Sequence, residues 1–371
     1  MENNDLEELH EIEETMEQVT KPKKRWKKVL LIVLLSLLGL IVVGLITIFI
    51  MGTRLLNLMP RTGGTEPTLS PEQVSQFEAE NTDPYDPNFS DESIDPTDVT
   101  WDTTPPDVEE TADIINILLI GSDTRVAGQR ARSDTMILCT LNKSKKTITM
   151  TSFLRDMYVQ IPGYKDNRIN VPYVFGGMEL LNKTIEKNFG IHIDGDFAVE
   201  FDSFKHVIDT IGGVSINLTQ READYMNNPA YYTGAEKEKT DLGFVAGVNN
   251  LNGTEALVYA RIRKLDSDFG RTDRQRNVML AAFNKCKNLS PAQMYKMLEK
   301  LLPLMTTNLD NETILKYAAQ VIPMMSGLKI ESKRIPVDGG YRNVWVGKMA
   351  VLMPDLAKNR KVLQEIVAPT E

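Results

Sequence analysis

Charged side chains are concentrated directly after segments of the sequence that are typical of buried strands. The stretch GSDTRVAGQRARSDTM (121–136) carries Asp123, Arg125, Arg132 and Asp134 between two such strands. In α/β proteins, ligand sites lie at strand ends. Two carboxylates at adjacent strand ends can share a hard cation such as Mg²⁺, which prefers oxygen ligands. The competing interpretation is a charged, solvated loop, because short motifs often match by chance.

A second charged stretch, YARIRKLDSDFGRTDRQRN (259–277), is rich in arginine. Arg261 and Arg263 are two residues apart, so an extended chain would place them on one side. Arg271 and Gln275 are four apart, and one helical face would hold both. Guanidinium groups bind phosphate through paired hydrogen bonds and stay charged, which suits a diphosphate. The alternative is a surface helix whose acidic residues balance the arginines, namely Asp266, Asp268 and Asp273.

Two further fragments place polar residues next to predicted elements. TSFLRDMYVQIP (151–162) carries Arg155 and Asp156 just after a strand, and RINVPYVFGG (168–177) carries polar side chains into a helix start. The three histidines are scattered, and none has the Cys/His spacing of a zinc site. The residues therefore favour phosphate chemistry through arginine over a histidine-based mechanism.

Short apolar runs and helical patterns alternate from residue 114 onward. Strands are predicted at 115–121, 136–142, 146–153, 197–202, 214–218 and 328–337, the second and third forming a hairpin. Helices are predicted at 178–190, 203–213, 253–260, 273–289, 291–302, 312–325 and 348–367. Strands mixed with helices throughout indicate an α/β domain whose sheet need not be all parallel.

The N-terminal region is predicted to anchor the chain in a membrane. Residues 1–28 are a polar tail that ends in KPKKRWKK, and residues 29–51 contain no charge. An apolar helix of this length spans a bilayer of about 30 Å. The basic cluster before it, against lone Arg54 after it, places the N-terminus in the cytoplasm and the remainder outside the cell. The competing interpretation is a cleaved signal peptide. Its apolar core would be shorter and would end in a small-residue cleavage site, which this segment does not show.

Charge divides the remainder into two regions, although the whole chain has a net charge of −9. Residues 52–113 are rich in Pro and Thr, and between Arg61 and Asp113 there are 15 acidic residues and one basic residue. This composition predicts a disordered, extended extracellular stalk. Residues 114–371 contain 34 Lys+Arg and 28 Asp+Glu, a net of +6. A basic domain favours anionic ligands.

Taken together and in this order, the motifs closely resemble those of the LytR-CpsA-Psr family of cell-wall ligases. The resemblance runs through INILLIGSDTR, RSDTM, SFLRD, RINVPYVFGG and VYARIRKLDSDFGRTDRQRNVM, a motif core at about 114–290. It implies a three-layer α/β/α domain with a mixed central sheet. It further implies a Mg²⁺-dependent phosphotransferase that moves a glycopolymer, such as teichoic acid or capsule, from a polyprenyl-pyrophosphate carrier to a peptidoglycan hydroxyl.

The resemblance also assigns roles to individual residues. Asp123 and Asp134 match the metal-binding aspartates, and Asp268 matches a carboxylate that we interpret as the base for the acceptor hydroxyl. Arg155 and Arg263 are expected to take part in the chemistry itself. The positions that match pyrophosphate-binding residues are Arg132, Arg155, Arg261, Arg263, Arg271 and Gln275.

Other functions stay open at the level of sequence. A polyprenyl-pyrophosphate hydrolase would use the same residues with water as acceptor, and a lipid-binding or regulatory envelope protein would need no catalysis. A nucleic-acid partner is disfavoured because the basic domain is expected outside the membrane. Which glycopolymer and which acceptor are used is not encoded in these motifs. Cys139 and Cys286 are read as free thiols in preference to one disulfide bridge.

Overall fold

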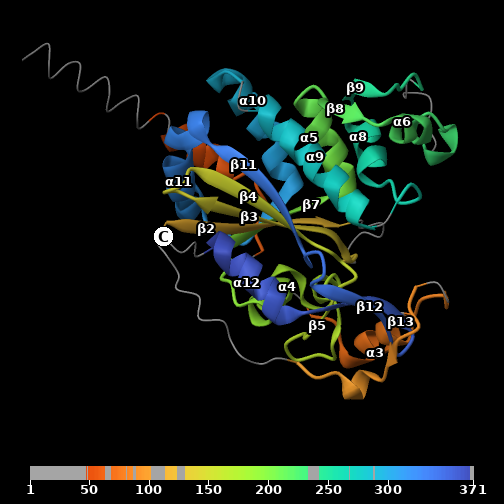
Figure 1. Cartoon of the computed structure of the whole chain (residues 1–371). Coiled ribbons are helices and arrows are strands. Elements are labelled where there is room, and N and C mark those ends of the chain that lie inside the picture. The colour runs from red at the N-terminus through yellow and green to blue at the C-terminus, as the bar shows by residue number, and fades with distance from the viewer. Residues whose placement is uncertain are drawn as a thin grey trace, which may run out of the picture. The chain divides into compact units, whose positions relative to one another are not determined.

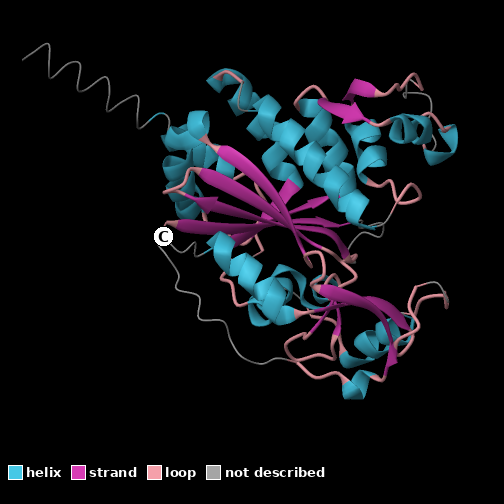
Figure 2. Ribbon diagram, viewed as in Figure 1, coloured by secondary structure: helices cyan, strands magenta, loops and turns pink. Residues whose placement is uncertain are grey.

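The computed structural model describes residues 47, 49–62, 68–80, 82–86, 89–101, 113–122, 130–232, 242–266, 268–286 and 289–367 (Figures 1 and 2). The chain divides into two units, Met1–Arg54 and Leu55–Glu371. The predicted anchor at 29–51 belongs to the first unit and lies almost entirely outside the described residues. Among the helices that are described, none combines the length and apolarity needed to cross a bilayer.

A mixed six-stranded sheet forms the centre of the second unit, in the order β10-β7-β2-β3-β4-β11. Neighbours β2–β3, β3–β4 and β7–β10 are antiparallel, whereas β2–β7 and β4–β11 are parallel. The predicted hairpin and the mixed sheet are therefore confirmed. The strands are β2 (Ile114–Ser122), β3 (Ser133–Asn142), β4 (Thr147–Phe153), β7 (Gly195–Glu200), β10 (Met305–Thr307) and β11 (Lys329–Ile335).

Helices cover both faces of the sheet (Figures 1 and 2). One face carries α4 (Pro172–Phe189) and α12 (Leu356–Val367). Alternate strand residues point to the same face, and on this one they form the largest core with the two helices. Among the strand residues of that core are Leu118, Ile120, Met136 and Leu138, all fully buried. As predicted, α4 ends at Gly190, which has a left-handed φ of 65°.

The other face carries α5 (Phe201–Thr210), α8 (Gly253–Ala260), α9 (Asp268–Cys286) and α10 (Pro291–Leu301) (Figure 1). These helices build a second core with α6 (Gln220–Met226) and with β8 (Val214–Leu218). The predicted strand at 214–218 does not join the central sheet. It pairs with β9 (Gly247–Leu251) in a separate two-stranded sheet.

The predicted helix at 348–367 is wrong in its first part. A hairpin of β12 (Tyr341–Val346) and β13 (Met349–Pro354) precedes α12. Its turn contains Gly347 at φ 57°, a conformation that glycine adopts without strain. The valines of both strands are buried in a small core with Tyr158, so the apolar run fits an alternating strand better than a helix.

The predicted disordered stalk is wrong for several of its residues. Helix α3 (Pro71–Glu80) places Val74 and Phe77 against a core around Phe175. Strand β1 (Ser93–Ile94) joins β12 in parallel, and the Trp101 indole nitrogen donates to Asp166 at 2.6 Å. An acidic average composition concealed these few apolar side chains, which are enough to attach the segment to a domain that is already folded.

Residues 55–62, which also belong to the predicted stalk, contact the domain as well. Leu55, Leu56 and Met59 pack against Leu302. The Thr62 amide donates to the carbonyl of Thr307 at 3.1 Å, and the Thr307 amide donates to Pro60 at 3.3 Å. The outer side of edge strand β10 is therefore paired.

Replacing Phe77 with Ala should lower the free energy of unfolding by about 1–2 kcal/mol, because a half-buried ring and its contact with a second aromatic ring are lost. The ring meets Phe175 edge-on at 5.3 Å. Chemical denaturation of the full-length protein would measure this, with the exposed Gln76→Ala on the same helix as the control. Equal stability of both variants would show that α3 does not depend on this contact.

Candidate functional site

Asp134 and Arg155 lie at the same end of the β3–β4 hairpin. Asp134 is the second residue of β3, and Arg155 follows the last residue of β4 by two positions. The Arg155 Nη1 atom donates to Asp134 Oδ1 at 2.7 Å, and Arg263 Nη2 lies 3.9 Å from Oδ2. The structure therefore brings together residues from three of the five motifs.

The pKa of Asp134 reports the charges around it. Burial alone would raise this pKa, but Arg155, with Arg271 and Arg263, lowers it below the ordinary carboxyl value. Asp134 is therefore a carboxylate held among at least three guanidinium groups. Such a cluster has an excess of positive charge that a bound anion would neutralise.

Arg132 adds a fourth cation to the same place. Burial and the charge of Arg155 lower the pKa of Arg132, while Asp134 and Asp156 oppose the shift. Its guanidinium group lies over the ring of Phe77, 5.0 Å from the centroid. Helix α3, which the sequence assigned to a stalk, thus supports one of the predicted pyrophosphate-binding residues.

Arg274 fixes the loop that carries Arg261 and Arg263. It donates to Glu222 at 2.7 Å, to Asp266 at 2.6 Å and to the carbonyl of Ile262 at 3.1 Å. Ile262 is fully buried, and the arginines on either side of it are exposed. The interpretation of Asp266 as a charge-balancing residue is confirmed, and Arg274 has a structural role.

Helix α9 begins five residues earlier than predicted, at Asp268 instead of residue 273. Gly270 leaves room for the Asp266 carboxylate beside this start, because a Cβ atom there would collide with it. Arg271 therefore lies in the first turn of the helix and is almost fully buried, while Gln275 lies one turn later and is half-buried. The predicted common face of these two residues follows from that spacing.

Two predicted site residues cannot be placed. Asp123 and the neighbouring residues to 129 lie outside the described part of the chain, and the side chain of Asp268 does so as well. Arg261 ends α8, its backbone amide donating to Leu257 at 3.1 Å, and its side chain is exposed. The roles of these three residues stay predictions.

Arg334 is a cation next to α9 that the sequence analysis did not single out, and it pairs with Asp338. It lies on β11, paired in register with Ser152 of β4, whose hydroxyl accepts from Arg276 at 2.8 Å. The Arg334 guanidinium group lies 4.6 Å from the ring centroid of Phe269 in α9. A strand had been predicted at 328–337, so an arginine near its carboxyl end was the available signal.

Arg168 has a different role from the other motif arginines. It is buried, pairs with Asp83, and donates to the carbonyl of Ala350 at 3.0 Å. It joins the segment before β1 to β13, so we interpret it as structural.

The described residues contain no group of three or more His, Cys, Asp or Glu side chains that could hold a metal ion. Asp134 offers one carboxylate oxygen, Oδ2, that lies beyond hydrogen-bonding distance of Arg263. A magnesium ion prefers several oxygen ligands. The described donor set therefore fits such an ion only with further oxygens from Asp123, a phosphate or water.

The sheet face toward α9 is apolar beyond this charged end. Its residues Ile117 and Cys139 are paired in register, as are Leu119 and Phe197. These four side chains are half-buried, whereas Ile115 and Ile137 on the same face are buried. Surrounding protein raises the pKa of the Cys139 thiol to about 12, yet part of its surface stays accessible. Both cysteines are free thiols, as predicted.

The family model of the LytR_cpsA_psr family matches residues 76–366. The chain therefore belongs to this family, and the resemblance found in the sequence is confirmed.

Among the relatives, a Bacillus licheniformis protein named polyisoprenyl-teichoic acid–peptidoglycan teichoic acid transferase TagU is 37% identical over 194 residues, 50% of this chain and 58% of that protein. The Staphylococcus aureus regulatory protein MsrR is 32% identical over 234 residues, 62% of this chain and 67% of that protein. The chain thus spans little more than half of the first of these.

A solved structure of a family protein, YwtF (TagT) with bound octaprenyl pyrophosphate lipid, has the same fold. It superimposes with a TM-score of 0.52 at 26% identity, covering 71% of this chain and 95% of that one. The mixed α/β fold expected from the sequence is thereby confirmed.

The ion pair at Asp134 should make stability depend on pH only in strong acid. Because the folded pKa is lowered, its stabilising contribution is complete above the unfolded carboxyl pKa of about 3.9 and is lost as the pH falls through the lower folded value. The difference in unfolding free energy between wild type and Asp134→Asn should therefore be constant at neutral pH and shrink below about pH 4. A difference that already shrinks near neutral pH would contradict the assignment.

Proposed function

We propose that this protein transfers a phosphate-linked glycopolymer, such as teichoic acid or capsule, from a polyprenyl-pyrophosphate carrier to a peptidoglycan hydroxyl. The observation that carries the proposal is the cluster of Arg132, Arg155, Arg263 and Arg271, four guanidinium groups gathered beside the carboxylates of Asp134 and Asp156. The half-buried apolar face beside it suits a polyprenyl tail, so charged head and apolar tail have adjacent places. The names of the TagU and TagT relatives point to the same reaction.

The proposed reaction breaks the phosphoanhydride bond of the carrier. An acceptor hydroxyl oxygen attacks the phosphorus atom that bears the glycopolymer, a phosphodiester forms, and the lipid phosphate leaves. Arg155 and Arg263 stabilise the negative charge that grows on the departing phosphate, with Arg132, Arg261, Arg271 and Gln275 holding the diphosphate. The hydroxyl proton passes to a carboxylate, for which Asp268 is the candidate.

Magnesium is part of this proposal, with Asp123 and Asp134 as its protein ligands. When bound, the ion would add charge neutralisation at the diphosphate oxygens. The guanidinium groups around Asp134 repel a cation, so the protein alone is a poor site and the diphosphate must supply part of the ligand set.

We also propose that residues 29–51 span the membrane once, with the N-terminus in the cytoplasm and the catalytic domain outside the cell. The uncharged run and the basic cluster at 21–28 support this orientation. Peptidoglycan, the proposed acceptor, lies on that outer side.

Transfer should depend on the forked geometry of the arginines as well as on their charge. Full-length protein in detergent would be incubated with a polyprenyl-pyrophosphate oligosaccharide, Mg²⁺ and peptidoglycan fragments, and products identified by mass spectrometry. Arg155→Lys and Arg263→Ala should each slow transfer by roughly a hundredfold or more, because a donor to the developing charge is lost or misplaced. Lys264→Ala is the matched control, since Lys264 is exposed beside Arg263 and faces Tyr231.

The outcomes separate the alternatives. Lipid phosphate released without a ligated product would mean a hydrolase. Lipid bound and unchanged with every acceptor would mean a binding or regulatory protein, as the name of MsrR allows. Near-normal transfer by folded Arg155→Lys and Arg263→Ala would remove both residues from the mechanism.

Magnesium affinity should rise when pyrophosphate is present, by roughly tenfold or more, because the anion neutralises the arginines and supplies oxygens. Calorimetric titration of the full-length protein with Mg²⁺, with and without inorganic pyrophosphate, measures this after correction for Mg²⁺–pyrophosphate binding in solution. Asp134→Asn should abolish the increase. Equal affinity in both conditions would argue against a metal site shared with the diphosphate.

A further inference from the structure

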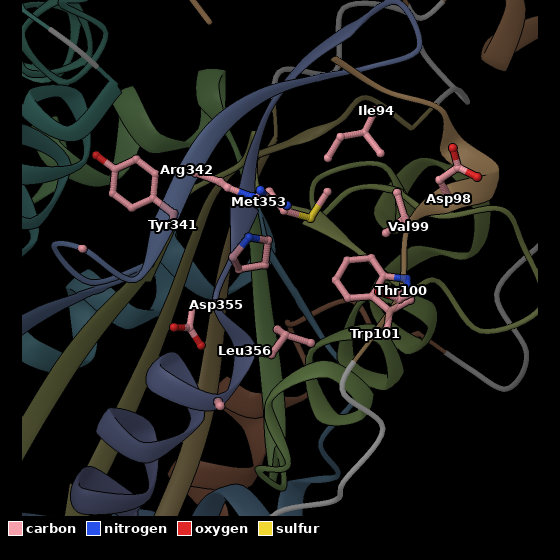
Figure 3. A pocket seen from close by; sticks show the side chains of 13 residues that line it. Ile94, Asp98, Val99, Thr100, Trp101, Tyr341, Arg342, Met353, Asp355 and Leu356 are labelled. Carbon is pink, nitrogen blue, oxygen red and sulfur yellow. The ribbon is translucent and has the colours of Figure 1, made fainter. Parts of the chain in front are cut away.

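A pocket of about 480 Å³ lies outside the arginine cluster, between residues 94–101 and the β12–β13 hairpin. Figure 3 shows Asp98, Val99 and Trp101 along one side, with Tyr341, Arg342 and Asp355 across from them. The predicted motifs assign nothing here, because both walls lie outside the motif core.

The chemistry of the lining suits an uncharged sugar ring. Buried Met353 and Leu356 form an apolar floor, and Trp101 offers a half-buried aromatic wall. The apolar C–H face of a pyranose can stack on such a ring, while carboxylates accept from its hydroxyl groups. Asp98 and Asp355 are exposed at the rim, where their carboxylates can accept such hydrogen bonds.

The side chains that matter here are held in place. The Trp101 ring stacks on Tyr158 with a centroid distance of 6.0 Å, and its indole nitrogen is bonded to Asp166. Asp355 Oδ1 caps α12 by accepting from the Lys358 amide at 3.0 Å. A wall fixed in this way loses little conformational entropy when a ligand binds.

The charge of the pocket indicates whether a bound sugar would belong to the phosphate-bearing glycopolymer of the donor or to the neutral glycan of the acceptor. Asp98 and Asp355 outnumber Arg342, which already pairs with Glu92 at 2.6 Å. A glycopolymer that carries phosphates would be repelled by this acidic rim, whereas a neutral glycan would not. The charged residues that line the pocket, two aspartates and one arginine, therefore have a net charge opposite in sign to that of the arginine cluster.

One aromatic contact connects the pocket to the proposed reaction site. Tyr341 lines the pocket, and its ring lies 5.4 Å from that of Phe269 in the first turn of α9. The Phe269 ring also contacts the guanidinium group of Arg334, and Phe269 precedes Arg271 by two residues. A glycan in the pocket would thus extend toward the place where the phosphate is transferred.

We propose that this pocket binds a sugar ring of the acceptor glycan strand, beside the site of phosphate transfer. The identity of the sugar as the acceptor's rests on the proposed function. Binding of a saccharide in the pocket does not, so the two can fail separately.

The test measures binding without the lipid donor. Full-length protein in detergent would be titrated calorimetrically with a soluble β-1,4-linked N-acetylglucosamine oligomer. Trp101→Leu and Asp98→Ala should each weaken binding by roughly three- to tenfold, through the lost aromatic face and the lost hydrogen bond. Trp345→Leu is the control for Trp101→Leu, because Trp345 belongs to the small sheet of β12 and β13 but does not line the pocket. Lys348→Gln, an exposed residue outside the pocket, is the control for Asp98→Ala, and neither control should weaken binding.

Where transfer occurs, the same variants should raise the KM for acceptor fragments and leave the KM for the lipid donor unchanged. A wild-type protein that does not bind the oligomer, or variants that bind it as wild type does, would overturn the pocket. A raised KM for the donor alone would assign the sugar to the carrier and overturn the acceptor proposal. Oligomer binding without any transfer would retain the pocket and reject the proposed function.

Discussion

The contact between Asp134 and Arg155 is the interaction on which the rest of the site depends. Several guanidinium groups gather at the end of one hairpin, and their mutual repulsion at low dielectric is costly unless an anion lies among them. Asp134 is a carboxylate that Arg155, Arg263 and Arg271 share. It holds the cluster together but does not balance it. The remaining positive charge is the property that a diphosphate would satisfy.

Some of the arginines have a structural role, and these help to hold the functional arginines in place. Arg274 bonds Glu222, Asp266 and the Ile262 carbonyl, and so fixes the loop that presents Arg263. Arg168 is committed to Asp83 and Ala350. Arg168 and Arg274 are each bonded to carboxylates, whereas the four arginines of the cluster are more numerous than Asp134 and Asp156, the carboxylates beside them. A sequence shows all of them only as arginines in a basic stretch.

Local patterns predicted the elements well, because strand alternation and glycine helix ends are read directly from neighbouring residues. The β3–β4 hairpin and the helix end at Gly190 are examples. Predictions were wrong where distant contacts decide. The acidic segment around Phe77, predicted to be disordered, is ordered by Phe175 and Arg132. The strand at 214–218 was predicted correctly, but its pairing with β9 outside the central sheet could not be read from its own residues. Arg334 lies beside Phe269 of α9 through the register of β11 with Ser152 of β4, a pairing that no single segment encodes.

The two outer strands of the central sheet also have a consequence for how the protein behaves at high concentration. Along its outer side, β10 is bonded to residues 60–62, while β11 presents Lys329, Glu331 and Lys333 as exposed charges. An edge strand without such protection can act as a template on which the strand of another chain pairs. With one edge already hydrogen-bonded and the other carrying charge, copies of this protein can crowd together without joining sheet to sheet.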